Sequence, residues 1–206
     1  MKRILHKYSF IVVILFILTA CSDDVPQLLP LQQDDVILAF GDSLTFGMGS
    51  ESATESYPAI LQILSGKTVV NAGIPGEFSQ AGLERLPHVL ANISPKLVIL
   101  CHGGNDLIRR LDIVQLERNL AQMIKIIQAS GAQVILVAVP ALSLTLDVPD
   151  LYQNLATEHA IPIEADVIRY VEMEASLKSD QIHPNAQGYR LIAENIYQLL
   201  QASHAL

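Results

Sequence analysis

The chain has 206 residues, half of them hydrophobic, and 21 acidic residues against 13 Lys and Arg give it a formal net charge of −8. This acidic balance argues against a nucleic-acid partner, because nucleic-acid phosphates are bound by basic surfaces. A chain of this length is expected to form one domain with a sizeable core.

The first 20 residues have the pattern of a targeting signal. Lys2, Arg3 and Lys7 make a basic start, an apolar run over residues 10–18 follows, and the segment ends in Leu18-Thr19-Ala20-Cys21. The run is shorter than the roughly 20 apolar residues that a membrane-spanning helix needs, which favours a secretory signal. Its end resembles the bacterial lipobox, and that resemblance implies cleavage before Cys21 and lipidation of Cys21. The alternative is an ordinary cleaved signal with an incidental cysteine.

Cleavage before Cys21 would leave 10 basic against 21 acidic residues, a net charge of about −11. Residues 21–34 carry two prolines and no periodicity, so we predict a tether that lets the domain, residues 35–206, stand off the lipid. Ser22 is similar to the outer-membrane address of Gram-negative lipoproteins. The expected location is therefore the cell envelope, at the outer membrane facing the periplasm in a Gram-negative cell. Only Cys101 would remain free, and its place at the end of an apolar run predicts a buried, inert thiol.

Apolar runs alternate with helical patterns through the rest of the chain. Strands are predicted at residues 36–40, 68–72, 97–101, 134–139 and 161–164, and helices at 57–64, 80–92, 112–130, 149–160 and 185–202. The strand segments are apolar along nearly their whole length, which is typical of parallel strands covered on both faces. The pattern predicts an α/β fold, a three-layer α/β/α sandwich around a five-stranded parallel sheet with right-handed crossovers.

Four short motifs carry the residues that could do chemistry. They are Gly41-Asp42-Ser43-Leu44, Asn71-Ala72-Gly73-Ile74-Pro75-Gly76, Gly103-Gly104-Asn105-Asp106 and Asp180-Gln181-Ile182-His183-Pro184. The first three follow the first three predicted strands, and sites in parallel sheets form beyond the carboxyl ends of the strands. We therefore expect Ser43, Gly76 and Asn105 to lie close together.

Ser43 would stand on a strand-to-helix turn with its hydroxyl exposed, although Asp42 or Ser43 could instead simply cap the following helix. The Asn105 side-chain amide and the Gly76 N–H could donate to a developing oxyanion. The alternative for both residues is a tight turn, for which Gly and Asn-Asp are common.

Asp180 and His183 are spaced so that the carboxylate can accept a hydrogen bond from Nδ1 of the imidazole, leaving Nε2 free to take the Ser43 proton. The alternative is an ordinary surface loop before the last helix. Other histidines are weaker candidates: His88 lies within a predicted helix, and His102 has no obvious acidic residue to orient it.

Together the four motifs resemble the four sequence blocks of the GDSL, or SGNH, hydrolases, over nearly all of residues 35–203. The closest likeness is to the bacterial acyl-CoA thioesterase I, lysophospholipase and arylesterase group, carried by residues 71–87 and 103–106. The resemblance implies a flavodoxin-like sandwich that uses neither a metal nor a cofactor. It also implies the roles of the site residues: Ser43, Asp180 and His183 form the catalytic triad, and Ser43, Gly76 and Asn105 supply the oxyanion donors.

The chain departs from the family pattern in its second block. Gly76-Glu77-Phe78-Ser79 stands where the family usually has Gly-Asp-Thr-Ser. The glycine is kept, and Phe78 is expected to reshape the nearby acyl pocket. Residues 141–148 follow the fourth predicted strand, and their apolar side chains could line an acyl channel or pack against the body.

The leading hypothesis is a serine esterase that hydrolyses carboxylic acyl esters through an acyl-enzyme, similar to arylesterases, lysophospholipases and thioesterases. Its expected partners are a small-molecule or lipid acyl ester and, through the anchor, a membrane; we expect a monomer. The enzyme alternative is an envelope carbohydrate deacetylase, since the superfamily includes carbohydrate esterases. The non-enzyme alternative is a scaffold lipoprotein that has kept the fold without catalysis.

Overall fold

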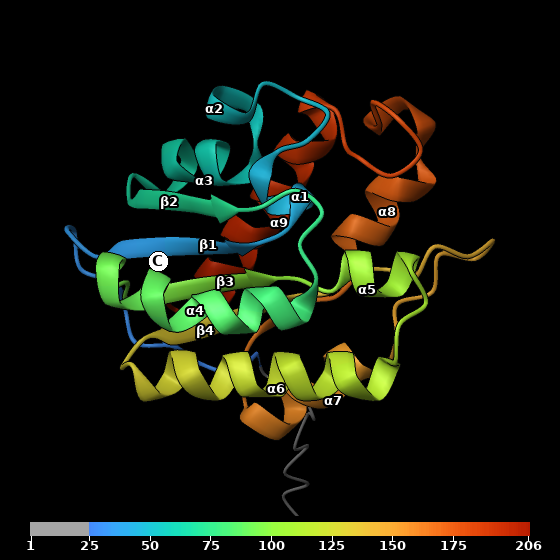
Figure 1. Cartoon of the computed structure of the whole chain (residues 1–206). Coiled ribbons are helices and arrows are strands. Elements are labelled where there is room, and N and C mark those ends of the chain that lie inside the picture. The colour runs from blue at the N-terminus through green and yellow to red at the C-terminus, as the bar shows by residue number, and fades with distance from the viewer. Residues whose placement is uncertain (1–24) are drawn as a thin grey trace, which may run out of the picture.

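Five parallel strands form the central sheet of the computed structural model, which describes residues 25–206 (Figure 1). The predicted signal and Cys21 lie outside the described residues. The strands are β1 Val36–Gly41, β2 Thr68–Gly73, β3 Leu97–Cys101, β4 Gln133–Val137 and β5 Ile163–Glu164, in the order β2-β1-β3-β4-β5. All four pairings are parallel, so the predicted five-stranded parallel sheet is confirmed.

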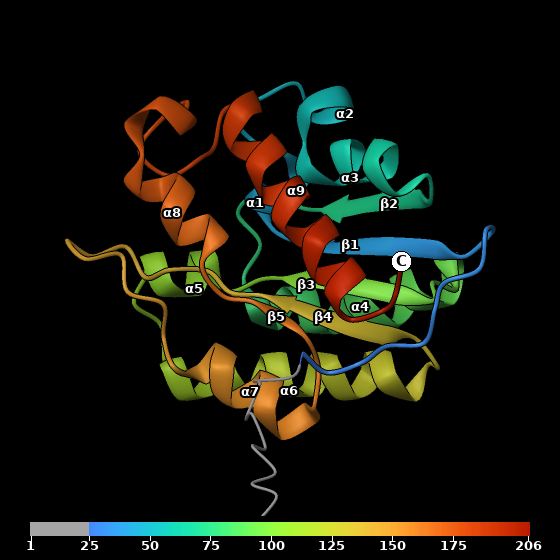
Figure 2. The same cartoon turned by 180° about the vertical axis from the view of Figure 1, so that it is seen from behind.

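Helices cover both faces of the sheet. They are α1 Ser43–Phe46, α2 Ser52–Glu55, α3 Tyr57–Ser65, α4 Ser79–Ile93, α5 Gly104–Ile108, α6 Ile113–Ala129, α7 Leu151–His159, α8 Val167–Met173 and α9 Ala186–Ala202, with a 3₁₀ turn, η1, at Ala175–Leu177. Helices α4 and α6 pack together on one face, and α3 and α9 pack together on the other. Figure 1 shows α4 in front of the strands, and Figure 2 shows α9 in front from behind, which confirms the three-layer sandwich.

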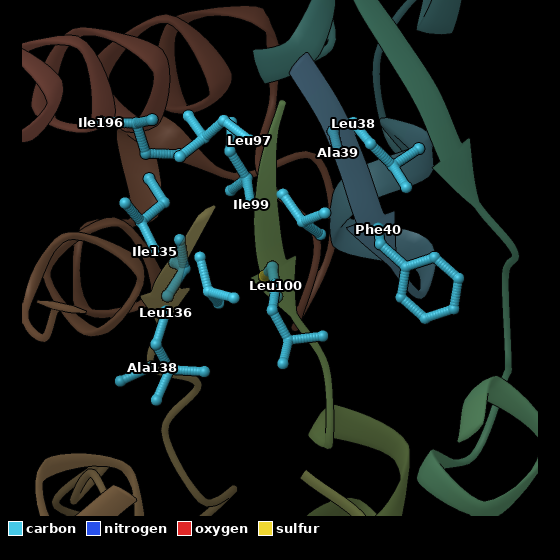
Figure 3. Close-up of a cluster of buried hydrophobic side chains, with 14 of the residues drawn as sticks. Leu38, Ala39, Phe40, Leu97, Ile99, Leu100, Ile135, Leu136, Ala138 and Ile196 are labelled. Atoms are coloured by element: carbon cyan, nitrogen blue, oxygen red, sulfur yellow. The ribbon is translucent and has the colours of Figure 1, made fainter. Parts of the chain in front are cut away.

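The core is centred on β1, β3 and β4. Residues 37–40, 97–101 and 134–137 have at most 1% of their surface exposed. Figure 3 shows side chains such as Leu38, Ile99 and Ile135 from these neighbouring strands, with Ile196 of α9 packed beside them. Fully burying one Ile, Leu or Phe contributes roughly 1.5–3 kcal/mol, so these continuous apolar runs dominate the stability of the sheet.

Capping side chains set where the long helices begin. The Asp112 carboxylate accepts a hydrogen bond from the Val114 N–H (2.9 Å) and starts α6. The Asn185 side chain accepts from the N–H groups of Gln187 and Gly188 and starts α9. Within residues 25–206, every helix is too short or too polar to cross a bilayer.

The segment just before β1 packs on the domain. The Leu28 N–H donates to the Ser203 carbonyl (2.8 Å), the Leu31 N–H donates to the Ala205 carbonyl (2.9 Å), and the Leu31 side chain is 9% exposed. Residues 28–31 therefore belong to the folded body, although the sequence analysis assigned them to the tether. The leucines of this segment have no helical or strand periodicity, so the sequence gives no sign of structure here. The residues that they contact lie at the other end of the chain, at positions 203 and 205.

The order of the strands determines where a site can form. From β1 the chain moves outward to β2 at the sheet edge and then returns across β1 to β3. The crevice between the carboxyl ends of β1 and β3 is thus the topological switch point, where open α/β sheets bind ligands. Helices α5 and α8 both lie at this end of the strands in Figures 1 and 2.

Candidate active site

Ser43 follows the end of β1 and is the first residue of α1. The turn needs glycine at position 41, because a Cβ there would collide with the Cys101 carbonyl oxygen and the Thr45 hydroxyl. Asp42 is buried and caps α1 by accepting a hydrogen bond from the Leu44 N–H (3.1 Å). With Asp42 as the cap, the Ser43 hydroxyl is left free to face the pocket.

His183 and Asp180 lie on the loop that precedes α9. The Asp180 Oδ1 atom accepts hydrogen bonds from the N–H groups of Ile182 and His183, each at 2.8 Å, and Oδ2 lies 2.7 Å from His183 Nδ1. Partial burial raises the pKa of Asp180, but these hydrogen bonds outweigh it and hold the pKa at about 2. Asp180 is therefore a carboxylate throughout the neutral range and fixes the orientation of the imidazole.

Folding brings the two ends of the chain together at this point. His183 Nε2 lies 3.2 Å from Ser43 Oγ, across 140 positions of sequence. The predicted Ser43, His183 and Asp180 thus form one continuous chain of hydrogen-bonding groups. A hydroxyl within hydrogen-bond distance of an oriented imidazole is the arrangement that activates a serine nucleophile.

The three residues expected to supply oxyanion donors, Ser43, Gly76 and Asn105, line one cavity. Gly76, at φ +77°, and Asn105, in the first turn of α5, line the same cavity as Ser43. In the described part of the chain, the backbone N–H groups of Ser43 and Gly76 have no protein acceptor. The Asn105 amide donates to the Glu77 carbonyl (3.0 Å) and has a long contact of 3.4 Å with Asp42, so one N–H is only weakly held.

The cavity beside Ser43 and His183 has a volume of about 300 Å³. Much of its wall is apolar, formed by Leu44, Met48, Ile108, Val139, Pro140 and Leu142. Of residues 141–148, only Leu142 lines the cavity, and Leu144 is fully exposed. Phe78 is not among the lining residues and is 37% exposed, so the expectation that it reshapes the pocket is wrong. Phe78 is the residue that directly precedes α4.

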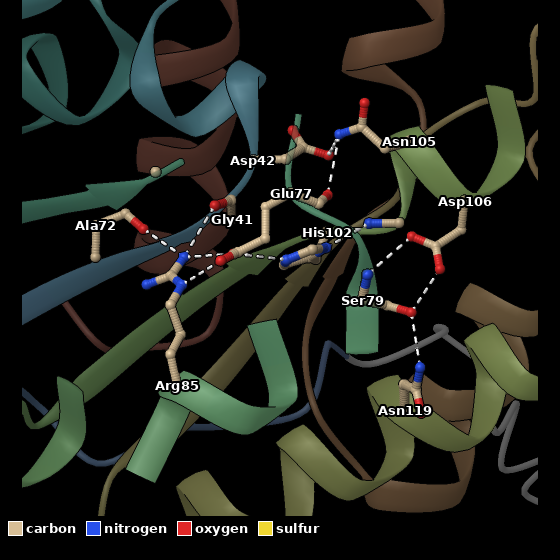
Figure 4. A network of polar contacts seen from close by, with 12 residues as sticks. Gly41, Asp42, Ala72, Glu77, Ser79, Arg85, His102, Asn105, Asp106 and Asn119 are labelled. Carbon is tan, nitrogen blue, oxygen red and sulfur yellow. Dashed lines mark hydrogen bonds and ion pairs between the residues drawn. The ribbon is translucent and has the colours of Figure 1, made fainter. Parts of the chain in front are cut away.

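A buried polar cluster behind the cavity was missed by the sequence analysis (Figure 4). Arg85 forms two hydrogen bonds with the Glu77 carboxylate (2.6 and 2.7 Å) and also donates to the carbonyls of Gly41 (3.2 Å) and Ala72 (2.8 Å). These contacts join the ends of β1 and β2 to the residue that follows Gly76. They hold the Ser43 turn and the Gly76 turn in a fixed relation.

His102 belongs to this cluster, and the expectation that it lacks an acidic partner is wrong. Its Nε2 lies 3.1 Å from Glu77 Oε2, and its Nδ1 accepts a hydrogen bond from the Gly103 N–H (2.9 Å). Because Nδ1 is an acceptor, the proton is on Nε2 and is donated to Glu77. Burial raises the pKa of Glu77, but hydrogen bonds from His102 and Arg85 hold it below the usual value. His102 is fully buried and engaged at both nitrogens, which suits a structural role.

The segment that follows the second motif is also bound to the third motif. The Asp106 carboxylate accepts hydrogen bonds from the Ser79 N–H (2.9 Å) and the Ser79 hydroxyl (2.7 Å), and Asn119 of α6 donates to Ser79 Oγ (2.8 Å) (Figure 4). All three side chains are buried. Asp106 therefore anchors the start of α4 beside α5, which carries Asn105.

Cys101 is buried, as expected, and burial raises the pKa of its thiol well above the usual range. Such a thiol is a poor nucleophile, because the thiolate is the reactive form. Among the described residues, His, Cys, Asp and Glu side chains form no group of three or more that could hold a metal ion.

Glu172 lines the cavity itself, and the sequence analysis did not identify it. It lies on α8, it is 5% exposed, and it lines the cavity with Ser43 and His183. Burial raises its pKa from 4.5 to about 7; the nearby charge of Lys178 opposes the rise and that of Asp42 adds to it. Helix α8 is too short for a periodic sequence signal, so nothing in the sequence singled out Glu172.

We expect Glu172 to make the fold less stable as the pH rises through the neutral range. Its pKa is higher in the folded than in the unfolded chain, so the folded state binds more protons between about pH 4.5 and 7, and stability falls across this window. A shift of this size corresponds to roughly 3 kcal/mol. Denaturant unfolding at pH 5 and pH 8 should show this loss, and Glu172→Gln should remove most of it.

Glu174→Gln is the matched control, because Glu174 lies two positions away and is exposed. The contribution of Asp42, whose pKa is also raised by burial, is present in all three proteins and cancels in the comparison. Equal pH dependence in the unchanged protein and in Glu172→Gln would contradict the prediction.

Comparison with known proteins agrees with the fold and the motifs. Residues 39–191 match the model of the GDSL-like Lipase/Acylhydrolase family. The chain is 33% identical over 175 residues to the thioesterase 1/protease 1/lysophospholipase L1 of Escherichia coli, covering 81% of this chain and 84% of that protein. It is 28% identical over 187 residues to an arylesterase of Vibrio mimicus, covering 82% and 90%.

The fold is also that of a solved esterase, EstA from Pseudoalteromonas sp., with a TM-score of 0.73, coverage of 82% of this chain and 97% of that chain, and 23% identity. The family match spans most of the domain, from β1 into α9, and includes Ser43, Gly76, Asn105, Asp180 and His183. The chain therefore belongs to the GDSL-like lipase/acylhydrolase family and is an ester-bond hydrolase of the esterase, thioesterase and lysophospholipase type.

Proposed function

We propose that this protein hydrolyses carboxylic acyl esters in two steps, through an acyl-enzyme on Ser43. The observation that carries the proposal is the 3.2 Å contact between Ser43 Oγ and His183 Nε2, with Asp180 2.7 Å from His183 Nδ1. His183 takes the Ser43 proton as the hydroxyl attacks the acyl carbonyl, and it returns the proton to the leaving group. Water then attacks the acyl-enzyme by the same route, and the acid and Ser43 are released.

The oxyanion formed in each step would be held by the N–H groups of Ser43 and Gly76 and by the Asn105 amide. Each such donor is typically worth roughly 10²–10³ in turnover, because it is already oriented when the charge develops. The Glu77–Arg85 pair supports this role by fixing the turns that carry two of the donors. Asp180 remains ionised and stabilises the imidazolium that forms on His183.

We propose acyl esters, including lipid esters, as the substrate class. The apolar walls of the cavity favour hydrocarbon over the polar rings of an envelope glycan, which is the substrate of the alternative deacetylase. The Escherichia coli relative carries lysophospholipase and thioesterase in its name, and the Vibrio mimicus relative is named an arylesterase. Lipidation of Cys21 would anchor the enzyme in the cell envelope, close to such esters.

The proposal is tested with p-nitrophenyl esters from acetyl to palmitoyl. A cavity of about 300 Å³ is at the small end of ligand pockets. We therefore expect kcat/KM to be highest for short to medium chains and to fall by at least tenfold at palmitoyl. The absence of turnover across the whole series, together with no labelling of Ser43 by a fluorophosphonate, would instead support the scaffold alternative.

A further inference from the structure

Glu172 places a carboxyl group in the wall of the substrate cavity, and no step of the proposed reaction uses it. The side chain comes from α8, while Ser43, Asn105 and His183 come from other elements that meet at the same cavity. It is 5% exposed, so the protein body and the cavity, rather than bulk water, surround the group. A buried carboxyl in such a place requires a physical reason.

No described residue forms a hydrogen bond or an ion pair with the Glu172 carboxyl. Asp42, the other buried carboxyl of the cavity, is different, because it accepts from the Leu44 N–H and contacts the Asn105 amide. Asp42 is thus committed to the fold, whereas Glu172 retains its full capacity to accept. The Glu172 oxygens are not among the fully buried side-chain atoms without a partner, so they open onto the cavity that Glu172 lines, and a ligand there can supply the hydrogen bond.

The polar residues of the cavity wall, among them Asn105, Arg109 and His183, form no hydrogen bond or ion pair with Glu172. Val139, Leu142 and Ile182 add hydrocarbon to the same wall, and Lys178 influences Glu172 only through its charge. Burial keeps the pKa of Glu172 near neutral, at about 7, so both protonation states exist at physiological pH and both can accept a hydrogen bond. A plain alkyl chain beside this carboxyl would leave it unpaired, and a substrate with a hydrogen-bond donor would pair it.

We propose that Glu172 forms a polar subsite that accepts a hydrogen bond from a hydroxyl or amino group of the substrate. The preferred substrate is then an ester that carries such a donor, not an unsubstituted fatty ester. This inference rests on the proposed hydrolysis at Ser43. The donor can be on the acyl chain or on the alcohol, as in a glycerol monoester with its free hydroxyls, and the chemistry that Glu172 recognises is the same.

Two pairs of esters test the proposal and separate these sources. The acyl pair is p-nitrophenyl 6-hydroxyhexanoate against p-nitrophenyl hexanoate, and the alcohol pair is glycerol 1-monohexanoate against propyl hexanoate. We expect kcat/KM to be about tenfold higher for the hydroxylated member of at least one pair, as one additional hydrogen bond allows. Glu172→Leu should bring that ratio close to one, by raising the rate for the plain ester and lowering the rate for the hydroxylated one.

Glu172→Gln keeps an amide oxygen as an acceptor and is expected to retain most of the preference, which distinguishes hydrogen bonding from charge. The exposed Glu174→Gln should behave as the unchanged protein. If Glu172→Leu does not fold, Glu172→Met, which is unbranched and similar in length, replaces it.

Ratios near one in both pairs for the unchanged protein would overturn the proposal, as would ratios that Glu172→Leu leaves unchanged. Hydrolysis of none of the four esters, nor of p-nitrophenyl acetate, would instead count against the proposed function. The two failures are therefore distinguishable in a single set of assays.

Discussion

Replacing Ser43 with alanine is expected to lower kcat on p-nitrophenyl esters on the order of 10⁶-fold, the loss typical of removing a serine nucleophile. Among the described side chains, the Ser43 Oγ atom forms a hydrogen bond only with His183 Nε2, so its removal takes away the nucleophile and no other side-chain hydrogen bond. Asp42, not Ser43, caps α1, so the turn after β1 should survive the change. Circular dichroism and thermal unfolding should match those of the unchanged protein.

The control is Ser65→Ala, because Ser65 lies at the end of α3, away from the cavity, where its hydroxyl donates to the Leu61 carbonyl and accepts from the Lys67 N–H. Its turnover should be unaffected. A fluorophosphonate should label the unchanged protein and Ser65→Ala and leave Ser43→Ala unlabelled. Full activity of a correctly folded Ser43→Ala protein would remove Ser43 from the mechanism.

The sheet could be predicted because its central strands are buried on both faces. The runs at residues 36–40 and 97–101 are apolar on both faces of the strand, and β1 and β3 lie inside the sheet rather than at its edges. The location of the site could be predicted by the same reasoning, because motifs that directly follow parallel strands all lie at the carboxyl-terminal edge of the sheet. The contact between Ser43 and His183 could be inferred only from the resemblance to a family, since no local pattern joins positions 140 residues apart.

Other parts of the structure depend on contacts that the sequence does not reveal. Helices α1, α2, α5 and α8 have four to seven residues, too few for an apolar period to be recognised. The Glu77–His102 pair joins positions on different loops, and Glu172 gains its importance only from the cavity that α8 helps to enclose. The roles of Glu77, His102 and Glu172 therefore come from tertiary packing alone.

Asp180→Asn is expected to lower kcat about 10⁴-fold, although the side chain keeps its size. The carboxylate now accepts three hydrogen bonds, two at Oδ1 from the N–H groups of Ile182 and His183 and one at Oδ2 from His183 Nδ1. An asparagine has one oxygen and one NH₂ group, so it cannot accept at both positions. If its oxygen faces the two backbone N–H groups, its NH₂ faces Nδ1 and requires Nδ1 to accept.

An imidazole that accepts at Nδ1 carries its proton on Nε2, the atom that faces the Ser43 hydroxyl, and it cannot then act as the base. The opposite orientation of the amide would set its NH₂ against two backbone N–H groups at 2.8 Å and disturb the loop. The measurement is kcat between pH 5 and 9 for Asp180→Asn, with the exposed Asp166→Asn as the control. Because the substitution changes the tautomer of His183 and not the binding of the substrate, KM should change little while kcat falls. A kcat within tenfold of the unchanged protein would show that His183 does not depend on Asp180 for its orientation.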